Sequence, residues 1–183
     1  MRVISGSLGG RRFYPDKLTH TRPTTDFAKT ALFNILNNHF DFQEISFLDL
    51  FSGTGSISFE FASRSCRRIV SVDKDESCNL FIRKMNKEWK IESIEVIRSD
   101  VFRYIESQRE QFDVIFAGPP YALENIGDIP SKVLELNILR DDGWFILETN
   151  QHYDFKELPG FFRRTNYGQT NFHFFKKLTH PTS

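Results

Sequence analysis

From residue 45 to residue 148, short apolar segments alternate with segments whose apolar residues recur at helical spacing. We expect strands at about 45–51, 68–73, 93–98, 112–117 and 143–148, and helices at about 55–63, 75–87, 101–108 and 128–137. The strands are apolar enough to be covered on both faces, which is typical of a mainly parallel sheet with helices on each side. The pattern therefore predicts an α/β fold.

Both ends of the chain depart from this alternation. Residues 2–13 have the pattern of two short strands around a glycine-rich turn, which predicts a β-hairpin arm. A helix is expected to follow Pro23, capped by Thr24 or Thr25. Its apolar stripe comprises Phe27, Ala31, Leu32, Ile35 and Leu36. Residues 161–167 and 170–175 are aromatic-rich and are expected to form an antiparallel hairpin that completes the sheet. We divide the chain into an N-terminal extension, 1–40, and one compact domain, 41–183.

The composition of the chain limits which classes of protein it can belong to. The chain has 183 residues, 39% of them hydrophobic and 20 of them Phe, which is enough for one domain with its own core and too much for a disordered chain. No apolar run approaches the ~20 residues of a membrane span, and residues 1–5 begin no signal peptide. The cysteines, Cys66 and Cys78, and the five histidines lack metal-ligand spacing. We therefore expect a cytoplasmic protein that uses neither membrane nor metal.

Charge is unevenly distributed although the net charge is zero. Residues 1–30 carry six Lys or Arg against two Asp, a net charge of +4, which leaves −4 for residues 31–183. Such asymmetry is typical of a basic arm that binds a polyanion, and an ordinary solvated face is the alternative. Arg11, Arg12 and Arg22 are the candidates for phosphate contacts. Thr24 is a further candidate contact for the same polyanion, although a helix cap is the more frequent role for such a residue.

A glycine turn follows the first expected strand, in the segment from Asp49 to Gly55 that contains Gly53. Glycines between a strand and a helix let the backbone approach a ligand, and the following helix N-terminus offers free N–H donors. Ser58 stands where a dinucleotide fingerprint requires a third glycine. Asp73 lies 20 residues after Gly53, where a carboxylate accepts hydrogen bonds from ribose hydroxyls, and helix capping is its alternative role.

A third acidic residue extends this series. Asp100 and Val101 follow the expected strand 93–98. Because ligands bind at the carboxyl ends of the strands in an open α/β sheet, Asp49, Asp73 and Asp100 are expected to line one crevice. Asp100 could accept a hydrogen bond from an adenine amine while the Val101 N–H donates to a ring nitrogen, and capping by Asp100 is compatible with that role.

The fourth expected strand ends in Gly118-Pro119-Pro120-Tyr121. With the glycine turn, this segment resembles the S-adenosylmethionine-dependent methyltransferases whose fourth strand ends in Asp/Asn-Pro-Pro-Tyr/Phe and which methylate nitrogen. The resemblance implies a Rossmann-like methyltransferase sheet, S-adenosylmethionine as cofactor and residues 118–121 as the catalytic loop. The cofactor-binding positions that it implies are Asp49, Phe51, Gly53, Gly55, Asp73, Lys74, Asp100 and Val101.

Gly118 departs from this pattern. The amine of a base is a poor nucleophile that gains positive charge during transfer, so acceptors must hold its N–H bonds while an aromatic ring stacks on the base. Tyr121 can stack and the Pro119 carbonyl can accept, but Gly118 has no side chain. Loss of a hydrogen bond worth roughly 1.5–3 kcal/mol slows transfer by about 10- to 150-fold. Either backbone carbonyls compensate, or the protein is a weakened relative, or Gly118 is a single-base change from Asp.

Within that superfamily the chain resembles the small bacterial 16S ribosomal RNA guanine-N2 methyltransferases. The resemblance is carried by Arg2-Val3-Ile4-Ser5-Gly6, Gly10-Arg11-Arg12, Arg22-Pro23-Thr24-Thr25-Asp26 and Tyr167-Gly168-x-Thr170-x-Phe172. It implies methylation of the guanine-966 type on the 30S subunit or an assembly intermediate. A DNA-adenine or protein-glutamine methyltransferase, and an RNA-binding protein that keeps S-adenosylmethionine with weakened catalysis, remain as alternatives. A nicotinamide-dependent enzyme is disfavoured by Ser58.

Overall fold

The computed structural model describes residues 1–15, 24–150 and 153–177. Within these ranges one seven-stranded sheet is formed by β1 (Ser46–Leu50), β2 (Arg68–Asp73), β3 (Ile94–Arg98), β4 (Phe112–Ala117), β5 (Leu139–Thr149), β6 (Phe161–Tyr167) and β7 (Thr170–Lys176). Its order is β3-β2-β1-β4-β5-β7-β6. The first five strands in this order pair in parallel, whereas β7 pairs antiparallel with both β5 and β6. The predicted α/β sheet and its antiparallel hairpin are thus confirmed.

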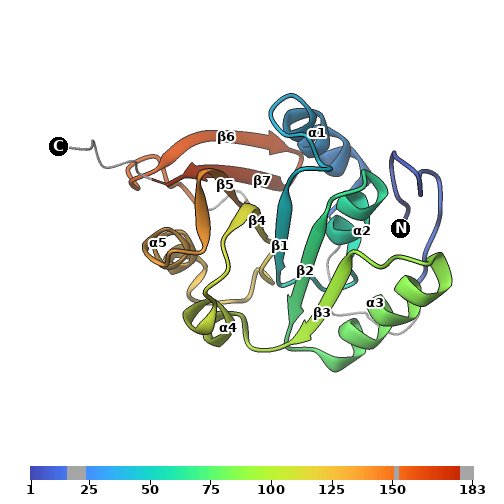
Figure 1. Ribbon diagram of the computed structural model, residues 1–183. Coiled ribbons are helices and arrows are strands. Elements are labelled where there is room, and N and C mark those ends of the chain that lie inside the picture. Colours follow the sequence, from blue (N-terminus) through green and yellow to red (C-terminus); the bar gives the residue numbers. More distant parts are fainter. Residues whose placement is uncertain (16–23, 151–152, 178–183) are drawn as a thin grey trace.

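Helices cover both faces of the sheet (Figure 1). They are α1 (Asp26–Asn37), α2 (Ser56–Ser63), α3 (Glu76–Trp89), α4 (Val101–Ser107) and α5 (Ile129–Glu135), and the 3₁₀ turn η1 (Ile126–Asp128) precedes α5. Alternate strand residues face opposite sides, so Phe47 joins the core under α1, α2 and α3, whereas Leu48 joins the core under α4 and α5. Both cores are therefore built from the period-two pattern of the strands.

The N-terminal segment packs against α2 rather than projecting as a free arm. The predicted hairpin forms in short form: Arg2 and Arg12 make an isolated antiparallel bridge, the Val3 N–H donates to the Arg11 carbonyl at 2.9 Å, and the Phe13 N–H donates to the Met1 carbonyl at 3.1 Å. Phe13 is buried with its ring against Phe59 of α2 at a centroid distance of 5.3 Å. Gly6 has a φ of +87°, and a Cβ there would collide with the Ser63 carbonyl oxygen. Close contact with the end of α2 therefore requires glycine at this position.

Helix α1 begins after its Thr25 cap, as predicted, and it buries Leu32, Ile35 and Leu36 of the expected apolar stripe. Phe27 is 70% exposed and contacts Tyr167, so its assignment to the apolar stripe is wrong. Lys29 is completely buried instead, with its Nζ 3.2 Å from Glu60 Oε1 and 2.6 Å from the Arg2 carbonyl oxygen. An ion pair with α2 thus turns a charged residue inward, which hydrophobic periodicity does not predict.

Two features complete the fold. The last parallel strand, expected at 143–148, is longer and spans Leu139–Thr149. Its pairing with β4 shifts register between Phe112 and Val114 of β4, which pair with Leu139 and Trp144. In the part of the chain that the structure describes, no helix is long and apolar enough to cross a membrane.

Candidate methyl-donor and substrate cavity

A cavity of about 520 Å³ lies at the carboxyl ends of the parallel strands. Of the predicted catalytic and cofactor-binding positions, all except Gly55 line it. The lining includes Asp49, Phe51, Gly53, Asp73, Lys74, Asp100, Val101, Gly118, Pro119, Pro120 and Tyr121. Thr24, Phe116 and Glu148 also line it. One continuous space therefore joins the glycine turn to the proline loop.

The glycine turn has a left-handed backbone at three positions. Phe51, Gly53 and Gly55 all have positive φ, of 60°, 50° and 76°. Gly55 precedes the first residue of α2, and a Cβ there would lie 2.9 Å from Ile82 Cγ1. The predicted cofactor residue Gly55 thus serves the packing of α2 against α3, while Phe51 and Gly53 face the cavity.

Asp73 ties the glycine turn to the next helix. Its Oδ2 accepts from the Gly53 N–H at 2.8 Å and its Oδ1 accepts from the Asp75 N–H at 2.9 Å. The cap of α3 is Asp75, which accepts from the Ser77 N–H, so the capping alternative applies to Asp75 rather than Asp73. A carboxylate has about four acceptor sites, so Asp73 keeps capacity for the hydroxyls of a ligand.

Asp49 forms the floor of the cavity and is 1% exposed. Its Oδ2 accepts from Ser58 Oγ at 2.6 Å, and Ser58 Oγ also lies 2.7 Å from Ser71 Oγ. Burial raises the pKa of Asp49 from 3.8 to about 7, although the Ser58 hydrogen bonds oppose that rise. The serine that breaks the dinucleotide fingerprint therefore holds a buried carboxyl group in place.

Asp100 and Val101 occupy the cavity wall at the start of α4. Asp100 Oδ1 accepts from the Arg103 N–H at 3.1 Å, so Asp100 does cap the helix. Because the same residue also lines the cavity, capping and ligand binding are compatible, as expected.

The proline loop leaves the sheet directly after β4. The Gly118 N–H donates to the Leu50 carbonyl at 3.2 Å, which anchors the loop to β1. The φ of Gly118 lies outside the left-handed region, so its backbone does not require glycine. A Cβ at this position would lie 3.1 Å from Phe116 Cε1 and 4.0 Å from Glu148 Oε2.

Glu148 is a cavity residue that the sequence motifs did not indicate. This residue is the penultimate residue of β5, and it follows four buried apolar residues, Trp144 to Leu147. The β4–β5 register pairs Ala117 with Leu147, so Gly118 and Glu148 follow at the same level of the sheet. Thr24 Oγ1 donates to Glu148 Oε2 at 2.6 Å. A carboxylate at the end of an apolar strand can be recognised in the sequence as a candidate site residue. That Glu148 lies beside Gly118 cannot be recognised there, because it depends on the order of the strands in the sheet.

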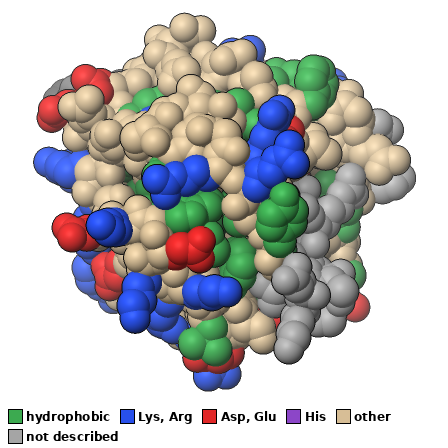
Figure 2. Space-filling model, turned by 90° about the vertical axis from the view of Figure 1, so that its right-hand side faces the viewer, with side chains coloured by type: hydrophobic (Ala, Val, Ile, Leu, Met, Phe, Trp, Pro, Cys, Tyr) green, Lys and Arg blue, Asp and Glu red, His purple; other side chains and the backbone are tan. Residues whose placement is uncertain are grey.

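Three of the four predicted RNA-contacting residues lie in the part of the chain that the structure describes. Thr24 lies in the cavity wall, whereas Arg22 lies outside the described residues. Arg11 and Arg12 are exposed, and the Arg11 guanidinium lies 5.7 Å from the Trp89 ring centroid. Figure 2, which views the side of the molecule that carries the N-terminal segment and α3, shows Lys and Arg side chains spread around exposed hydrophobic surface.

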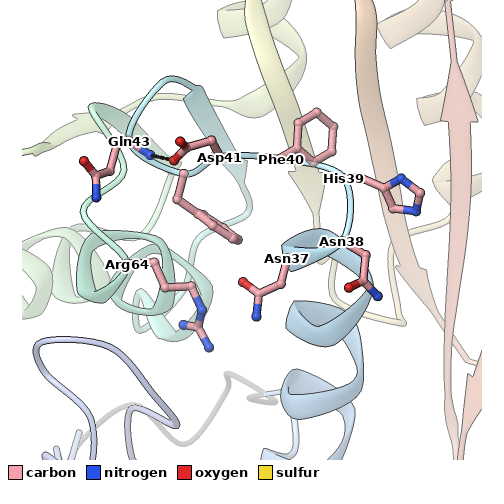
Figure 3. A pocket seen from close by; sticks show the side chains of 8 residues that line it. Asn37, Asn38, His39, Phe40, Asp41, Gln43 and Arg64 are labelled. Atoms are coloured by element: carbon pink, nitrogen blue, oxygen red, sulfur yellow. Dashed lines mark hydrogen bonds between the residues drawn. The ribbon is translucent and has the colours of Figure 1, made fainter.

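A second hollow, of about 580 Å³, lies at the opposite, amino-terminal end of the strands (Figure 3). It is shallow and open, and it is lined by residues 37–43 and Arg64. The Arg64 side chain reaches across it toward Asn37, but its guanidinium is held by Glu60 Oε2 at 2.6 Å. Among the described residues, none of the predicted catalytic, cofactor-binding or RNA-contacting positions lines this hollow.

The sheet order, the glycine turn with its acidic partner and the proline loop define the class of protein: an S-adenosylmethionine-dependent methyltransferase. The residues fit this cofactor, because carboxylates at the ends of β2 and β3 and open backbone at the glycine turn face one cavity. The family model described as "Conserved hypothetical protein 95" matches residues 1–176, and the chain belongs to this family.

Comparison with individual proteins agrees with this family. The chain is 31% identical over 184 residues to "Putative rRNA methyltransferase YlbH" of Bacillus subtilis (strain 168), covering 97% of this chain and 99% of that protein. It is 29% identical to "Ribosomal RNA small subunit methyltransferase D" of Haemophilus influenzae, covering 82% of this chain and 79% of that protein.

Solved structures share the fold. "Putative methyltransferase yhhF from Escherichia coli" has a TM-score of 0.85 at 18% identity, covering 98% of this chain and 99% of that chain. The Thermus thermophilus 16S rRNA N2 G1207 methyltransferase, solved with AdoMet and guanosine, has a TM-score of 0.68 at 21% identity, covering 86% of this chain and 45% of that chain.

Proposed function

We propose that this protein transfers a methyl group from S-adenosylmethionine to the exocyclic N2 amine of a guanine in 16S ribosomal RNA, in the 30S subunit or an assembly intermediate. The rRNA substrate is supported by the names of the relatives, and the guanine by the sequence resemblance and by the guanosine-bound neighbour. One observation carries the proposal: a single cavity is lined both by Asp73 at the glycine turn and by Tyr121 of the proline loop.

The residues of the cavity divide into two groups. Asp73, Asp100 and Val101 offer acceptors and a donor suited to the hydroxyls and base of an adenosine. Pro119 and Tyr121 offer a carbonyl acceptor and a ring that can stack on an extruded base. S-Adenosylmethionine, when bound, supplies an electrophilic methyl group on a sulfonium.

The basic residues of the N-terminal segment have a separate role in this proposal. Arg11 and Arg12 are exposed and suited to contact phosphates, which orient the RNA without reading its sequence. The extension 1–40 thus acts as the RNA-positioning part of the chain, although Val3, Phe13 and Leu32 pack into the same hydrophobic core as α2.

The test identifies the methylated nucleoside. Purified protein is incubated with methyl-deuterated S-adenosylmethionine and 30S particles, or free 16S rRNA, from a strain that lacks the corresponding gene, and the RNA is digested for mass spectrometry. We expect deuterated N2-methylguanosine. Labelled methyladenosine, or label found in protein glutamine instead of RNA, would overturn the guanine assignment in favour of another nitrogen substrate, and absence of label would overturn the proposed activity.

A further inference from the structure

The proposed reaction needs an acceptor that Gly118 does not provide. Positive charge develops on the attacking nitrogen, so a carboxylate close to its N–H bonds stabilises the transition state. At position 118 the backbone could carry a side chain, but none is present. An acceptor from another element would have to reach the same part of the cavity.

Glu148 reaches that part of the cavity. It comes from β5, the strand next to β4, and its Oε2 lies 4.0 Å from the place that a Cβ on Gly118 would occupy. The residue is 8% exposed and lines the cavity together with Gly118 and Tyr121. Thr24 Oγ1 holds the same oxygen at 2.6 Å, which fixes the orientation of the carboxylate.

We propose that Glu148 is the side-chain acceptor for the substrate amine, and that it replaces from the neighbouring strand the carboxylate that Gly118 lacks. This inference rests on the proposed function and names a catalytic residue for it. Each carboxylate oxygen accepts two hydrogen bonds, so Oε2 can serve Thr24 and an amine together.

The step balances without a further reactant. The nitrogen lone pair forms the new N–C bond while the C–S bond of the methyl donor breaks and its electron pair stays on sulfur. The positively charged nitrogen then loses one proton, which passes to the Glu148 carboxylate and from there to water. Glu148 is thus regenerated as a carboxylate, and the products are the methylated amine and S-adenosylhomocysteine.

The surroundings of Gly118 yield a specific expectation for the Gly118→Asp variant. A Cβ there would lie 3.1 Å from Phe116 Cε1, so the phenyl ring would have to shift by a few tenths of an ångström. The new carboxylate would also stand beside Glu148, and like charges at that distance repel each other. We therefore expect no gain from Gly118→Asp in the wild-type background, and a gain once Glu148 is neutral.

The experiment compares wild type, Glu148→Gln, Gly118→Asp and the double variant in methyl transfer to 16S rRNA. We measure kcat, KM for RNA, the dissociation constant of S-adenosylhomocysteine and the melting temperature. Glutamine keeps an oxygen that can accept from Thr24, so the fold should persist. Glu106→Gln, on the exposed surface of α4, is the matched control and should behave as wild type.

The expected result is a fall in kcat of about 10- to 150-fold for Glu148→Gln, with KM and cofactor affinity within about twofold of wild type, and a partial recovery of kcat in the double variant. If Glu148→Gln does not fold, Glu148→Asp, which withdraws the carboxylate by one methylene, is expected to lower kcat in the same way. Unchanged kcat would overturn the inference and assign the role to backbone carbonyls. If Glu148→Gln weakened S-adenosylhomocysteine binding by the same factor as it lowered kcat, the inference would be overturned in favour of a structural role for Glu148. A wild type that methylates no guanine would instead overturn the proposed function itself.

Discussion

Thr24 and Thr25 are neighbours in the sequence with different contacts in the fold. Thr25 caps α1 by accepting from the Ala28 N–H, whereas Thr24 donates to Glu148 in the cavity. The sequence predicts that one of the pair caps the helix, because Ser, Thr, Asp and Asn favour that position. It cannot predict the second contact, because Glu148 lies 124 residues away.

This difference leads to a paired prediction. We expect Thr24→Val to lower kcat for methyl transfer by about 2- to 13-fold, because a hydrogen bond worth roughly 0.5–1.5 kcal/mol no longer orients Glu148. Thr25→Val is expected to cost about 1 kcal/mol of stability because the helix cap is removed, with little change in kcat. Methyl-transfer kinetics and thermal melting of both variants test this prediction. An equal fall in kcat for Thr24→Val and Thr25→Val would contradict it.

The raised pKa of Asp49 predicts how the stability of the protein depends on pH. Its pKa in the folded protein is about 7 against 3.8 ordinarily, so between these values the unfolded chain loses the proton that the folded chain keeps. The free energy of unfolding that protonated Asp49 contributes is therefore fully present below pH 3.8 and is lost as the pH rises through about 7. Asp49→Asn removes the titration and keeps an acceptor for Ser58.

The melting temperature of Asp49→Asn, relative to wild type, should therefore rise between pH 5 and pH 8. The change in stability is on the order of 2 kcal/mol, which corresponds to roughly 4–8 °C for a chain of this size. A difference in melting temperature that stays constant across this range, measured by circular dichroism, would show that Asp49 is ionised throughout.

At the level of elements, most of the fold was predictable because strands and helices have different hydrophobic periods. The order and approximate bounds of the central strands, the α1 cap and the aromatic hairpin are confirmed. The sequence could not reveal that the N-terminal turn packs on Ser63 or that Phe27 is exposed, because both depend on how distant elements meet. The pairing of β4 with β5, which brings Glu148 to Gly118, likewise follows from topology.

Three elements meet at a buried ion pair. Glu60 of α2 accepts from the Ile4 N–H at 2.7 Å, from Lys29 of α1 at 3.2 Å and from Arg64 at 2.6 Å. Both Lys29 and Glu60 have no exposed side-chain surface. The pair thus joins the N-terminal segment and α1 to the helix that follows the glycine turn.

We expect Lys29→Met to lower the free energy of unfolding by up to about 3–5 kcal/mol, because it removes one of the two cations that pair with the buried Glu60 carboxylate and leaves Arg64 as the other. Lys84→Met, on the exposed face of α3, is the control and should change stability by less than about 0.5 kcal/mol. Urea unfolding measures both variants. Similar values for the two would mean that Glu60 is satisfied without Lys29.

At the scale of the whole molecule, the candidate cofactor cavity and the proposed RNA surface belong to different parts of the chain. The cavity lies at the ends of the parallel strands, while Arg11 and Arg12 lie on the N-terminal segment. The net charge of residues 1–30 predicted this division, but not all of the positive charge in that segment is available to bind RNA. Lys29 is buried, and Arg2 pairs with Asp26 at 2.8 Å.

Reversing the charge of both Arg11 and Arg12 to Glu should weaken rRNA binding and leave affinity for S-adenosylhomocysteine unchanged. The slope of log affinity against log salt concentration should fall by roughly one for each RNA phosphate that the variant no longer neutralises. Arg109→Glu, exposed on the loop after α4, provides a control for net charge. Filter binding over a salt series would contradict the assignment if the slope of the Arg11 and Arg12 variant equalled that of wild type.

The central claim is that one cavity, framed by Asp73 and the proline loop, holds the methyl donor beside the substrate base. The most direct test is a crystal structure of the protein with S-adenosylhomocysteine. The ribose hydroxyls are predicted to bind the Asp73 carboxylate, with the adenine against Asp100 and Val101 and the sulfur directed toward residues 118–121. A ligand bound in the hollow lined by residues 37–43, or bound without contact to Asp73, would contradict the account.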